Sequence, residues 1–447
     1  MKLLSLDRRL LENFCWPLIL SMLALCCCGL LNLFSVSAYN YAGEAWSWFA
    51  RQAGFLGLAL GLLFVILLVD YQYLKRFIWP LYGLSLALLA ATLAIGTEIN
   101  GAVRWLDLGL VRFQPSESAK VVVVAALAAW FAKRDWSAEL GFRELVVPGL
   151  IIGLPFLLIH KQPDLGTALH LLATCAPMFL AFRLRPRLVL SLVMVGAVSL
   201  GVVGLAALTD SWPFLVDRGI LKPHQARRIE TFLSPASDPS NHGWQILQSQ
   251  NAVGGGQIFG RGFMAGPQQK NGFLPEAETD FAFAALAEEW GFVGCLTVLA
   301  LFLVLLGCGL QVARRSKDCF GSLIAVGLTS FLFWQVFINV AMVTGLLPVV
   351  GIPLPFISYG GTSLVVTVAA VGLMQNVSMR RYMFKDDPVR ENPGVWRQQP
   401  EERPRPAPTK PVRRLAADTP LDPELHPPHR LPHIRPWAKY LRGGRRI

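Results

Sequence analysis

Residues 14–36 read FCWPLILSMLALCCCGLLNLFSV, an apolar run that contains no charged side chain. A helix needs roughly 20 such residues to cross the hydrocarbon core of a bilayer. Similar runs recur as far as residue 379, so that 53% of the 447 residues are hydrophobic and only 16% are charged. Soluble proteins carry about 25% charged residues. The sequence excludes a soluble enzyme and a single-anchor receptor, and it predicts an all-α polytopic membrane protein.

The hydropathy pattern predicts about ten transmembrane helices and one long loop at about 209–280. Ten spans place both chain termini on the same side of the membrane. Lys and Arg are concentrated in the loops on the side of the termini, and such loops face the cytoplasm. We therefore expect both termini to be cytoplasmic and the long loop to face outward. The predicted spans lie near residues 14–36, 52–69, 77–96, 114–132, 145–159, 165–182, 188–208, 281–312, 320–345 and 358–379.

The composition changes after the last predicted span. From residue 381 onward, Pro, Arg and Glu are frequent and large apolar side chains are few. Such a segment buries too little apolar surface to offset the entropy of ordering it. We divide the chain into a transmembrane domain, 1–380, and a disordered, basic, proline-rich cytoplasmic tail, 381–447. The net charge of +12 fits a membrane surface, and because no nucleic-acid motif accompanies it, we expect no nucleic-acid partner.

Three charged residues interrupt the apolar segments, where charges are costly and usually functional. Glu117 and Lys120 are three residues apart on the fourth predicted span, so they share one helix face. They form either a structural ion pair or part of a site inside the helix bundle. Asp164 follows Pro163 at the start of the sixth span, where it either caps that helix or contributes to a site. The Cys and His residues have no metal-ligand spacing, so no zinc site is expected.

The predicted outer loop is rich in acidic and glycine residues. Residues 276–280, EAETD, place three carboxylates directly before the eighth span. They either complement the dipole of that helix or supply a base at the membrane boundary. The run GGGQIFGRG (254–262) lacks the Gly-Lys-Ser/Thr ending of a phosphate-binding loop. Its glycines favour turns or close backbone contacts. The prolines and glycines of 345–363 predict a bent or re-entrant segment near the outer face.

Four long motifs resemble, in order, the signatures of the SEDS family of bacterial membrane proteins, which act in shape, elongation, division and sporulation. The resemblance covers residues 1–380. Within the family, the runs at 112–117 and 348–353 are more similar to the branch that maintains rod shape than to the division branch. The motifs are GAVRWLDLGLVRFQPSESAK (101–120), QPDLGTAL (162–169), LPEAETDFAFAALAEEWGFVG (274–294) and GLLPVVGIPLPFISYGGTS (345–363).

The resemblance implies a peptidoglycan glycosyltransferase that polymerises lipid II into β-1,4 glycan strands during cell elongation. The family's essential aspartate falls on Asp280, which would accept the proton of the attacking sugar hydroxyl. The resemblance also implies substrate binding by polar residues around a central cavity and near the outer surface. A divalent cation, Mg²⁺ or Mn²⁺, could offset the pyrophosphate charge, whereas no organic cofactor is implied. The implied substrate-binding residues are Glu117, Lys120, Asp164, Arg104 and Arg112.

The implied partners are lipid II, a class B penicillin-binding protein with transpeptidase activity, and scaffold proteins of the elongation complex. The implied location is the bacterial cytoplasmic (inner) membrane, with the active site facing outward. One departure from the family is Glu278, where many relatives carry His or Arg. An additional carboxylate there should favour the protonated form of Asp280 or attract a cation. The alternatives to polymerisation are a lipid-linked precursor flippase, the division-specific paralogue, and a non-catalytic scaffold.

Overall fold

The computed structural model of the protein describes residues 12–40, 43–99, 102–107, 109, 112–134, 139–187 and 242–381, and short pieces between 190 and 234. These residues belong to the unit Met1–Arg397. Nine of the ten predicted spans appear as helices. The seventh, near 188–208, lies largely outside the described residues, as does the predicted tail. The helices are α2 (Trp16–Asn40), α3 (Ala45–Leu68), α4 (Tyr71–Ile95), α5 (Pro115–Phe131), α6 (Val146–Lys161), α7 (Leu165–Leu180), α13 (Ala282–Arg315), α14 (Cys319–Val343) and α15 (Gly361–Met379).

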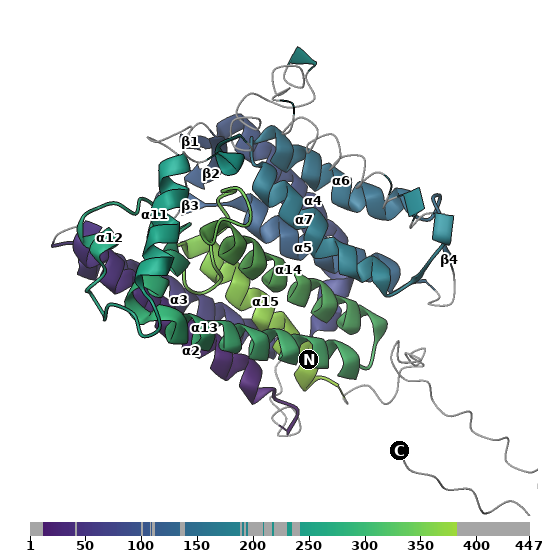
Figure 1. Ribbon diagram of the computed structural model, residues 1–447. Coiled ribbons are helices and arrows are strands. Elements are labelled where there is room, and N and C mark those ends of the chain that lie inside the picture. The colour runs from purple at the N-terminus through teal and green to yellow at the C-terminus, as the bar shows by residue number, and fades with distance from the viewer. Residues whose placement is uncertain are drawn as a thin grey trace, which may run out of the picture. The chain divides into compact units, whose positions relative to one another are not determined.

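Six of the described helices are long and apolar enough to cross a membrane: α2, α3, α4, α13, α14 and α15. The apolar helices α6 and α7 have 16 residues each, and α5 has 17. Most residues of α5, α14 and α15 are buried, whereas α3 and α4 expose large apolar side chains such as Phe64 and Phe77. Helices α5, α7, α14 and α15 form the middle of the bundle in Figure 1. The predicted polytopic all-α architecture is therefore confirmed.

Some helices begin at residues other than those predicted, because a capping residue fixes the start of the helix. Helix α4 was expected to begin near residue 77, because residues 71–76 carry polar and charged side chains. It begins at Tyr71, where Asp70 caps it by accepting a hydrogen bond from the backbone N–H of Gln72 at 2.9 Å. Asp318 caps α14 in the same way through the N–H of Gly321, at 3.2 Å. Polar residues at a helix start thus belong to the helix although they interrupt the apolar run.

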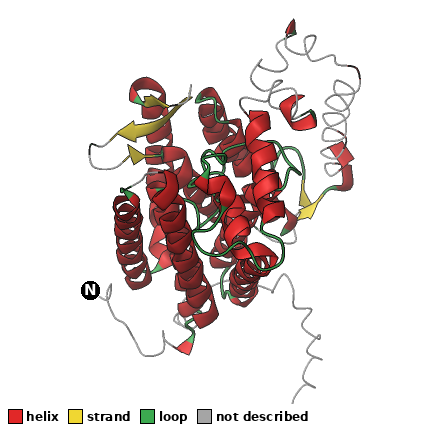
Figure 2. Cartoon of the chain, turned by 60° about the vertical axis from the view of Figure 1, so that its left-hand side comes forward, coloured by secondary structure: helices red, strands yellow, loops and turns green. Residues whose placement is uncertain are grey.

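The loops gather at two opposite ends of the bundle, as Figures 1 and 2 show. The sheet end carries an antiparallel sheet of three strands, in the order β1–β2–β3, and the helices α11 and α12. Two short parallel strands, β4 and β5, pair elsewhere in the chain. These elements were not predicted from the sequence. Their bounds are β1 (Thr97–Ile99), β2 (Ala102–Asp107), β3 (Arg112–Phe113), β4 (Glu139–Leu140), β5 (Arg183–Leu184), α11 (His242–Gly255) and α12 (Pro267–Lys270).

Loops that were assigned to the same side contact one another. At the end opposite the sheet, Arg380 forms an ion pair with Asp70 at 3.8 Å and donates a hydrogen bond to the carbonyl of Leu67 at 2.8 Å. Tyr71 donates a hydrogen bond to the carboxylate of Asp318. At the sheet end, Arg104 donates to the carbonyl of Pro163 at 3.0 Å. These contacts agree with the grouping of loops that the Lys and Arg distribution predicted.

The glycine-rich segment 256–262 forms backbone hydrogen bonds with α13 at a break in that helix. The helix leaves helical geometry at Gly291, whose φ is 66° and ψ is −167°. Beyond the break, the N–H groups of Phe292 and Val293 donate to the carbonyls of Gln257 and Ile258 at 2.8 and 3.0 Å. Before it, the carbonyls of Glu288 and Glu289 accept from the N–H groups of Arg261 and Gly262 at 2.9 and 3.0 Å. The segment satisfies backbone groups that a broken transmembrane helix would leave unpaired.

Gly260→Ala is expected to destabilise the protein by about 2–5 kcal/mol, the sum of backbone strain and overpacking. Gly260 has a φ of +80°, and a Cβ there would lie 2.0 Å from the carbonyl oxygen of Glu289. Thermal unfolding in detergent should show a clearly lower melting temperature. Gly254→Ala is the matched control, because a Cβ at Gly254 meets no atom within 4 Å and the residue lies in α11. Equal melting temperatures for the two variants would contradict the close packing of this segment against the break in α13.

Candidate functional site

The segment 345–360 forms the centre of the sheet end, between α14 and α15. A Cβ added to Gly351, whose φ is +73°, would lie 3.5 Å from Oδ2 of Asp280. A Cβ added to Gly166 would lie 2.6 Å from the carbonyl oxygen of Val350. The Asp280 carboxylate and the start of α7 therefore contact adjacent residues of one segment. The predicted bend is present, and it brings two predicted site residues, Asp164 and Asp280, to the same part of the molecule.

Hydrogen bonds to the backbone fix residues 278–280. Asn339 of α14 donates to the carbonyls of Asp280 at 3.0 Å and of Ile352 at 2.8 Å. The Ser358 hydroxyl donates to the carbonyl of Thr279 at 2.6 Å, and the N–H of Tyr359 donates to the carbonyl of Glu278 at 2.7 Å. The Asp280 side chain is half-buried. Its position is thus fixed through the main chain, and the residue is partly exposed.

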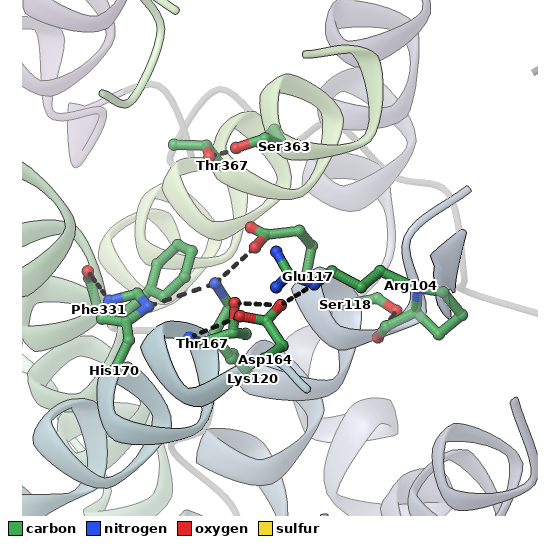
Figure 3. A network of polar contacts seen from close by, with 11 residues as sticks. Arg104, Glu117, Ser118, Lys120, Asp164, Thr167, His170, Phe331, Ser363 and Thr367 are labelled. Carbon is green, nitrogen blue, oxygen red and sulfur yellow. Dashed lines mark hydrogen bonds and ion pairs between the residues drawn. The ribbon is translucent and has the colours of Figure 1, made fainter. Parts of the chain in front are cut away.

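Asp164 caps α7 and also pairs with Arg104. Its carboxylate accepts hydrogen bonds from the N–H of Thr167 at 3.2 Å and from the hydroxyl of Thr167 at 2.8 Å. The guanidinium of Arg104, on β2, lies 3.7 Å from Oδ2 of Asp164 and donates to the carbonyl of Pro163 at 3.0 Å. Figure 3 shows Arg104 reaching Asp164 from the sheet side. Of the two alternatives for Asp164, the helix cap is confirmed, and the ion pair ties the sheet to α7.

A buried chain of polar groups connects α5, α7 and α14 (Figure 3). The Lys120 ammonium donates to Oε1 of Glu117 at 2.7 Å and lies 3.3 Å from Nδ1 of His170. Nε2 of His170 lies 3.1 Å from the carbonyl oxygen of Phe331, which can only accept, so Nε2 carries a hydrogen and Nδ1 accepts from Lys120. Lys120 also lies 5.2 Å from the centroid of the Phe331 ring. The structural ion pair of Glu117 and Lys120 is present.

This chain of polar groups is not fully satisfied by protein atoms. Glu117 and Lys120 are 3% and 1% exposed, so neither side chain reaches the surface in this conformation. Oε2 of Glu117 and the hydroxyl oxygen of Ser116 are buried without a hydrogen-bond partner. Buried polar atoms normally have a partner, which can be an ordered water or a ligand. These two atoms, on consecutive residues of α5, are therefore places where a water or a substrate group could bind.

Arg112, on β3, contacts the start of α15 through its backbone. The carbonyl of Arg112 accepts a hydrogen bond from the hydroxyl of Thr362 at 3.0 Å. Arg51, on α3, lies close enough for its charge to act on the Tyr359 hydroxyl. Burial raises the pKa of Tyr359 above its usual value of 10, while the charges of Arg51 and Arg112 act in the opposite direction. The Tyr359 hydroxyl therefore stays protonated near neutral pH.

The structure thus groups the predicted site residues into three sets: Asp164 with Arg104, Glu117 with Lys120, and Asp280 with the segment that also approaches Arg112. His170, Arg51 and Tyr359 were not predicted as site residues from the sequence. The signal for His170 was a polar side chain inside an apolar helix, which was set aside because the histidines lack metal-ligand spacing. Among the described residues, no group of three His, Cys, Asp or Glu side chains could hold a metal ion. A magnesium ion shared with substrate phosphates needs only one or two carboxylates, so the divalent cation remains a prediction.

The comparisons with known proteins agree with one another. Residues 16–383 match the family of FtsW, RodA and SpoVE, described as cell cycle proteins. The chain is 38% identical to the peptidoglycan glycosyltransferase MrdB of Escherichia coli K12, over 79% of this chain and 93% of MrdB. It resembles the solved rod shape determining protein RodA of Thermus thermophilus, with a TM-score of 0.59, 29% identity, and coverage of 83% and 98%. A chain of a peptidoglycan synthase complex that coordinates polymerization and crosslinking gives a TM-score of 0.68, 32% identity, and coverage of 83% and 99%.

Proposed function

This chain belongs to the FtsW, RodA and SpoVE family, and from that membership we propose that it is a peptidoglycan glycosyltransferase of the RodA type, with Asp280 at the reacting sugar. The enzyme class follows from relatives such as MrdB, which this chain matches over almost their whole length. The single observation that supports Asp280 is the position of its carboxylate beside Gly351, on a partly exposed residue whose backbone carbonyl accepts from Asn339. A carboxylate that is fixed and still accessible suits proton transfer.

The proposed reaction is a direct displacement on lipid II. The 4-hydroxyl oxygen of the acceptor sugar attacks the anomeric carbon of the donor, and the bond from that carbon to the lipid diphosphate breaks. Asp280 accepts the proton of the attacking hydroxyl, and the lipid diphosphate leaves with the bonding electrons. Attack from the face opposite the leaving group converts the α-linked donor into a β-1,4 glycoside. The reaction needs no nucleotide because the donor carries its own leaving group.

The remaining predicted site residues have supporting roles in this proposal. Arg104 and Asp164 join the sheet to the start of α7, which contacts Val350, the residue before Gly351. Glu117 and Lys120 provide a paired charge within the bundle, next to the unpartnered oxygens of Glu117 and Ser116. Arg112 lies near the surface, where its charge can offset that of the diphosphate. A divalent cation, Mg²⁺ or Mn²⁺, would supply the same electrostatic stabilisation if bound beside the Asp280 carboxylate.

The protein is a multi-pass membrane protein, and a structural neighbour comes from a peptidoglycan synthase complex. A penicillin-binding protein is therefore the expected partner, with elongation scaffold proteins as further partners. We propose the bacterial inner membrane as the location, with both termini in the cytoplasm and the sheet end facing outward. The Lys and Arg distribution supports this orientation. The sheet end carries Asp280, so it would meet lipid II at the outer membrane surface.

Polymerisation of lipid II in liposomes, with the cognate penicillin-binding protein present, tests this function. A ladder of glycan strands on a gel is the expected result. The main alternative is a precursor flippase, for which the buried charges Glu117 and Lys120 are the supporting observation. A flippase would transfer labelled lipid II between leaflets and give no ladder, although an active control polymerase does. That result would contradict the glycosyltransferase proposal.

A further inference from the structure

Two irregular segments of the backbone meet at Asp280. Residues 278–280 precede α13, and residues 350–358 lie in the connection between α14 and α15. A Cβ on Gly351 would lie 3.5 Å from Oδ2 of Asp280, so the two segments are in contact at the proposed base. Backbone groups outside helices and sheets need hydrogen-bond partners from elsewhere in the protein. Their partners therefore decide how the two segments sit relative to each other.

One side chain of α14, Asn339, bonds to both segments. Its Nδ2 donates to the carbonyl of Asp280 at 3.0 Å and to the carbonyl of Ile352, the residue after Gly351, at 2.8 Å. A side-chain amide nitrogen carries two hydrogens, so each carbonyl can receive one. The Asn339 amide thus spans the contact between Asp280 and Gly351, and it fixes the separation of the two backbones there.

The Asn339 amide uses only its donor side in these bonds. The residue is 0% exposed, and its Oδ1 has no hydrogen-bond partner among the described residues. A buried acceptor without a partner costs free energy. An apolar side chain of similar size would avoid that cost, but it could not donate to the two carbonyls. The role that the structure gives to this amide is therefore to hold the backbone at Asp280 and Ile352.

Ser358 connects the same two segments a second time. Its hydroxyl donates to the carbonyl of Thr279 at 2.6 Å and accepts from the N–H of Leu354 at 2.9 Å. Ser358 is buried, with an exposed fraction of 5%. Two consecutive carbonyls, those of Thr279 and Asp280, are therefore each held by a side chain from outside their own segment.

Helix α14 gives Asn339 a rigid support. Most residues of α14 are buried, and Asp318 caps its first turn. Near its other end, the Ser249 hydroxyl of α11 donates to the carbonyl of Val343 at 2.8 Å. Because both ends of the helix are fixed, Asn339 holds Asp280 in a constant position. Reaction rates depend steeply on such placement, since a shift of about 1 Å can lower a rate about 100-fold.

We propose that Asn339 and Ser358 are positioning residues that set the rate of the chemical step by holding the backbone of residues 279 and 280 against the segment that contains Gly351. Both act through Asp280 and contact no substrate group themselves. The inference rests on the proposed function, because it takes Asp280 as the base. It adds that the position of the base is determined from α14 and from the segment 350–358.

Asn339→Leu tests this role, because it removes both donor hydrogens at nearly constant volume. In liposomes with the penicillin-binding protein present, kcat for lipid II polymerisation should fall about 10- to 100-fold. KM should stay within about threefold, since the variant displaces the base and removes no substrate contact. Ser358→Ala removes one donor and should lower kcat about three- to tenfold, again with little change in KM.

Thr329→Val is the matched control. The buried Thr329 hydroxyl also belongs to α14 and donates to the carbonyl of Ala325 at 2.7 Å. It lies about 15 Å along the helix from Asn339. The variant loses a buried hydrogen bond away from Asp280, so its polymerisation rate should stay within about twofold of the wild type. Melting temperatures establish that each variant is folded.

A double variant separates positioning from a general effect on the fold. In the Asp280→Asn protein, Asn339→Leu should lower the remaining rate by no more than about threefold, because the base on which Asn339 acts is already absent. An equal loss with and without the Asp280 carboxylate would overturn the proposal. A wild-type kcat in folded Asn339→Leu and Ser358→Ala proteins, or a raised KM with unchanged kcat, would also overturn it. If Asn339→Leu does not fold, Ser358→Ala decides by the same criteria.

Hydrogen exchange of the backbone distinguishes failure of this inference from failure of the proposed function. Peptides that cover 278–283 and 350–358 should exchange faster in Asn339→Leu and at the wild-type rate in Thr329→Val. Unchanged exchange in Asn339→Leu would contradict the holding of these segments by α14. A wild type that does not polymerise lipid II, but whose exchange responds to Asn339→Leu, would contradict the glycosyltransferase and retain Asn339 as the support of Asp280.

Discussion

Asp280→Asn is expected to reduce the rate of lipid II polymerisation by a factor of about 100 to 10,000, the usual contribution of a general base. The amide keeps the size of the carboxylate but cannot accept a proton from the attacking hydroxyl. Folding should be preserved, because Asn339 bonds the backbone carbonyl of Asp280, and neighbouring contacts with Ser358 and Tyr359 also use the main chain. The measurement is the initial rate of glycan strand formation, together with the melting temperature of each protein.

Glu276→Gln is the matched control for this experiment. Glu276 is exposed, and its carboxylate accepts a hydrogen bond from the hydroxyl of Thr279 at 2.9 Å. Its substitution removes one negative charge four residues from Asp280 and should leave the rate within about threefold, because exposed charges have small effects. A folded Asp280→Asn protein with the rate of the wild type would exclude Asp280 as the base. Equal rate losses in both variants would show that the rate depends on the net charge of the loop and not on Asp280 itself.

Lys120→Met is expected to destabilise the protein by about 3–5 kcal/mol, the largest stability effect that we predict. The substitution removes the ammonium and leaves the Glu117 carboxylate buried, with Oε2 already unpartnered and Oε1 now without its donor. His170 loses the group that donates to its Nδ1. The melting temperature in detergent should fall strongly. Lys133→Met, at an exposed position just after α5, is the matched control and should change little.

The double variant Glu117→Gln with Lys120→Met separates the ion pair from the packing. Removing both charges avoids an uncompensated buried charge, so the double variant should be more stable than Lys120→Met alone. A melting temperature of the double variant at or below that of Lys120→Met would contradict a buried pair as the source of the effect. The polymerisation rate of a folded double variant then reports whether the pair also serves the reaction.

Much of the fold could be predicted from the sequence because the composition of a short segment determines whether it becomes a helix in the bilayer. An apolar run such as 14–36 must become a helix in lipid, since no water is present to satisfy its backbone groups. Nine spans were predicted in this way and are helices. The errors occurred where polar residues extend a helix, as with Asp70 and Tyr71 at the start of α4. The short strands β1–β3 were missed because two- to six-residue pairings leave almost no local pattern.

The candidate site, like the fold, could be predicted from the sequence only in part. The sequence alone determined the membrane class, the grouping of loops at two ends and the motifs that carry Asp280, Asp164, Glu117 and Lys120, because each depends on residues close together in the chain. Only the tertiary structure decided which of them meet. His170 reaches Lys120 across 50 residues, and Tyr359 packs against Trp48 of α3 and bonds to Glu278, although these three residues are far apart in sequence. Such contacts arise from helix packing, and neither periodicity nor spacing encodes which faces of two distant helices will touch.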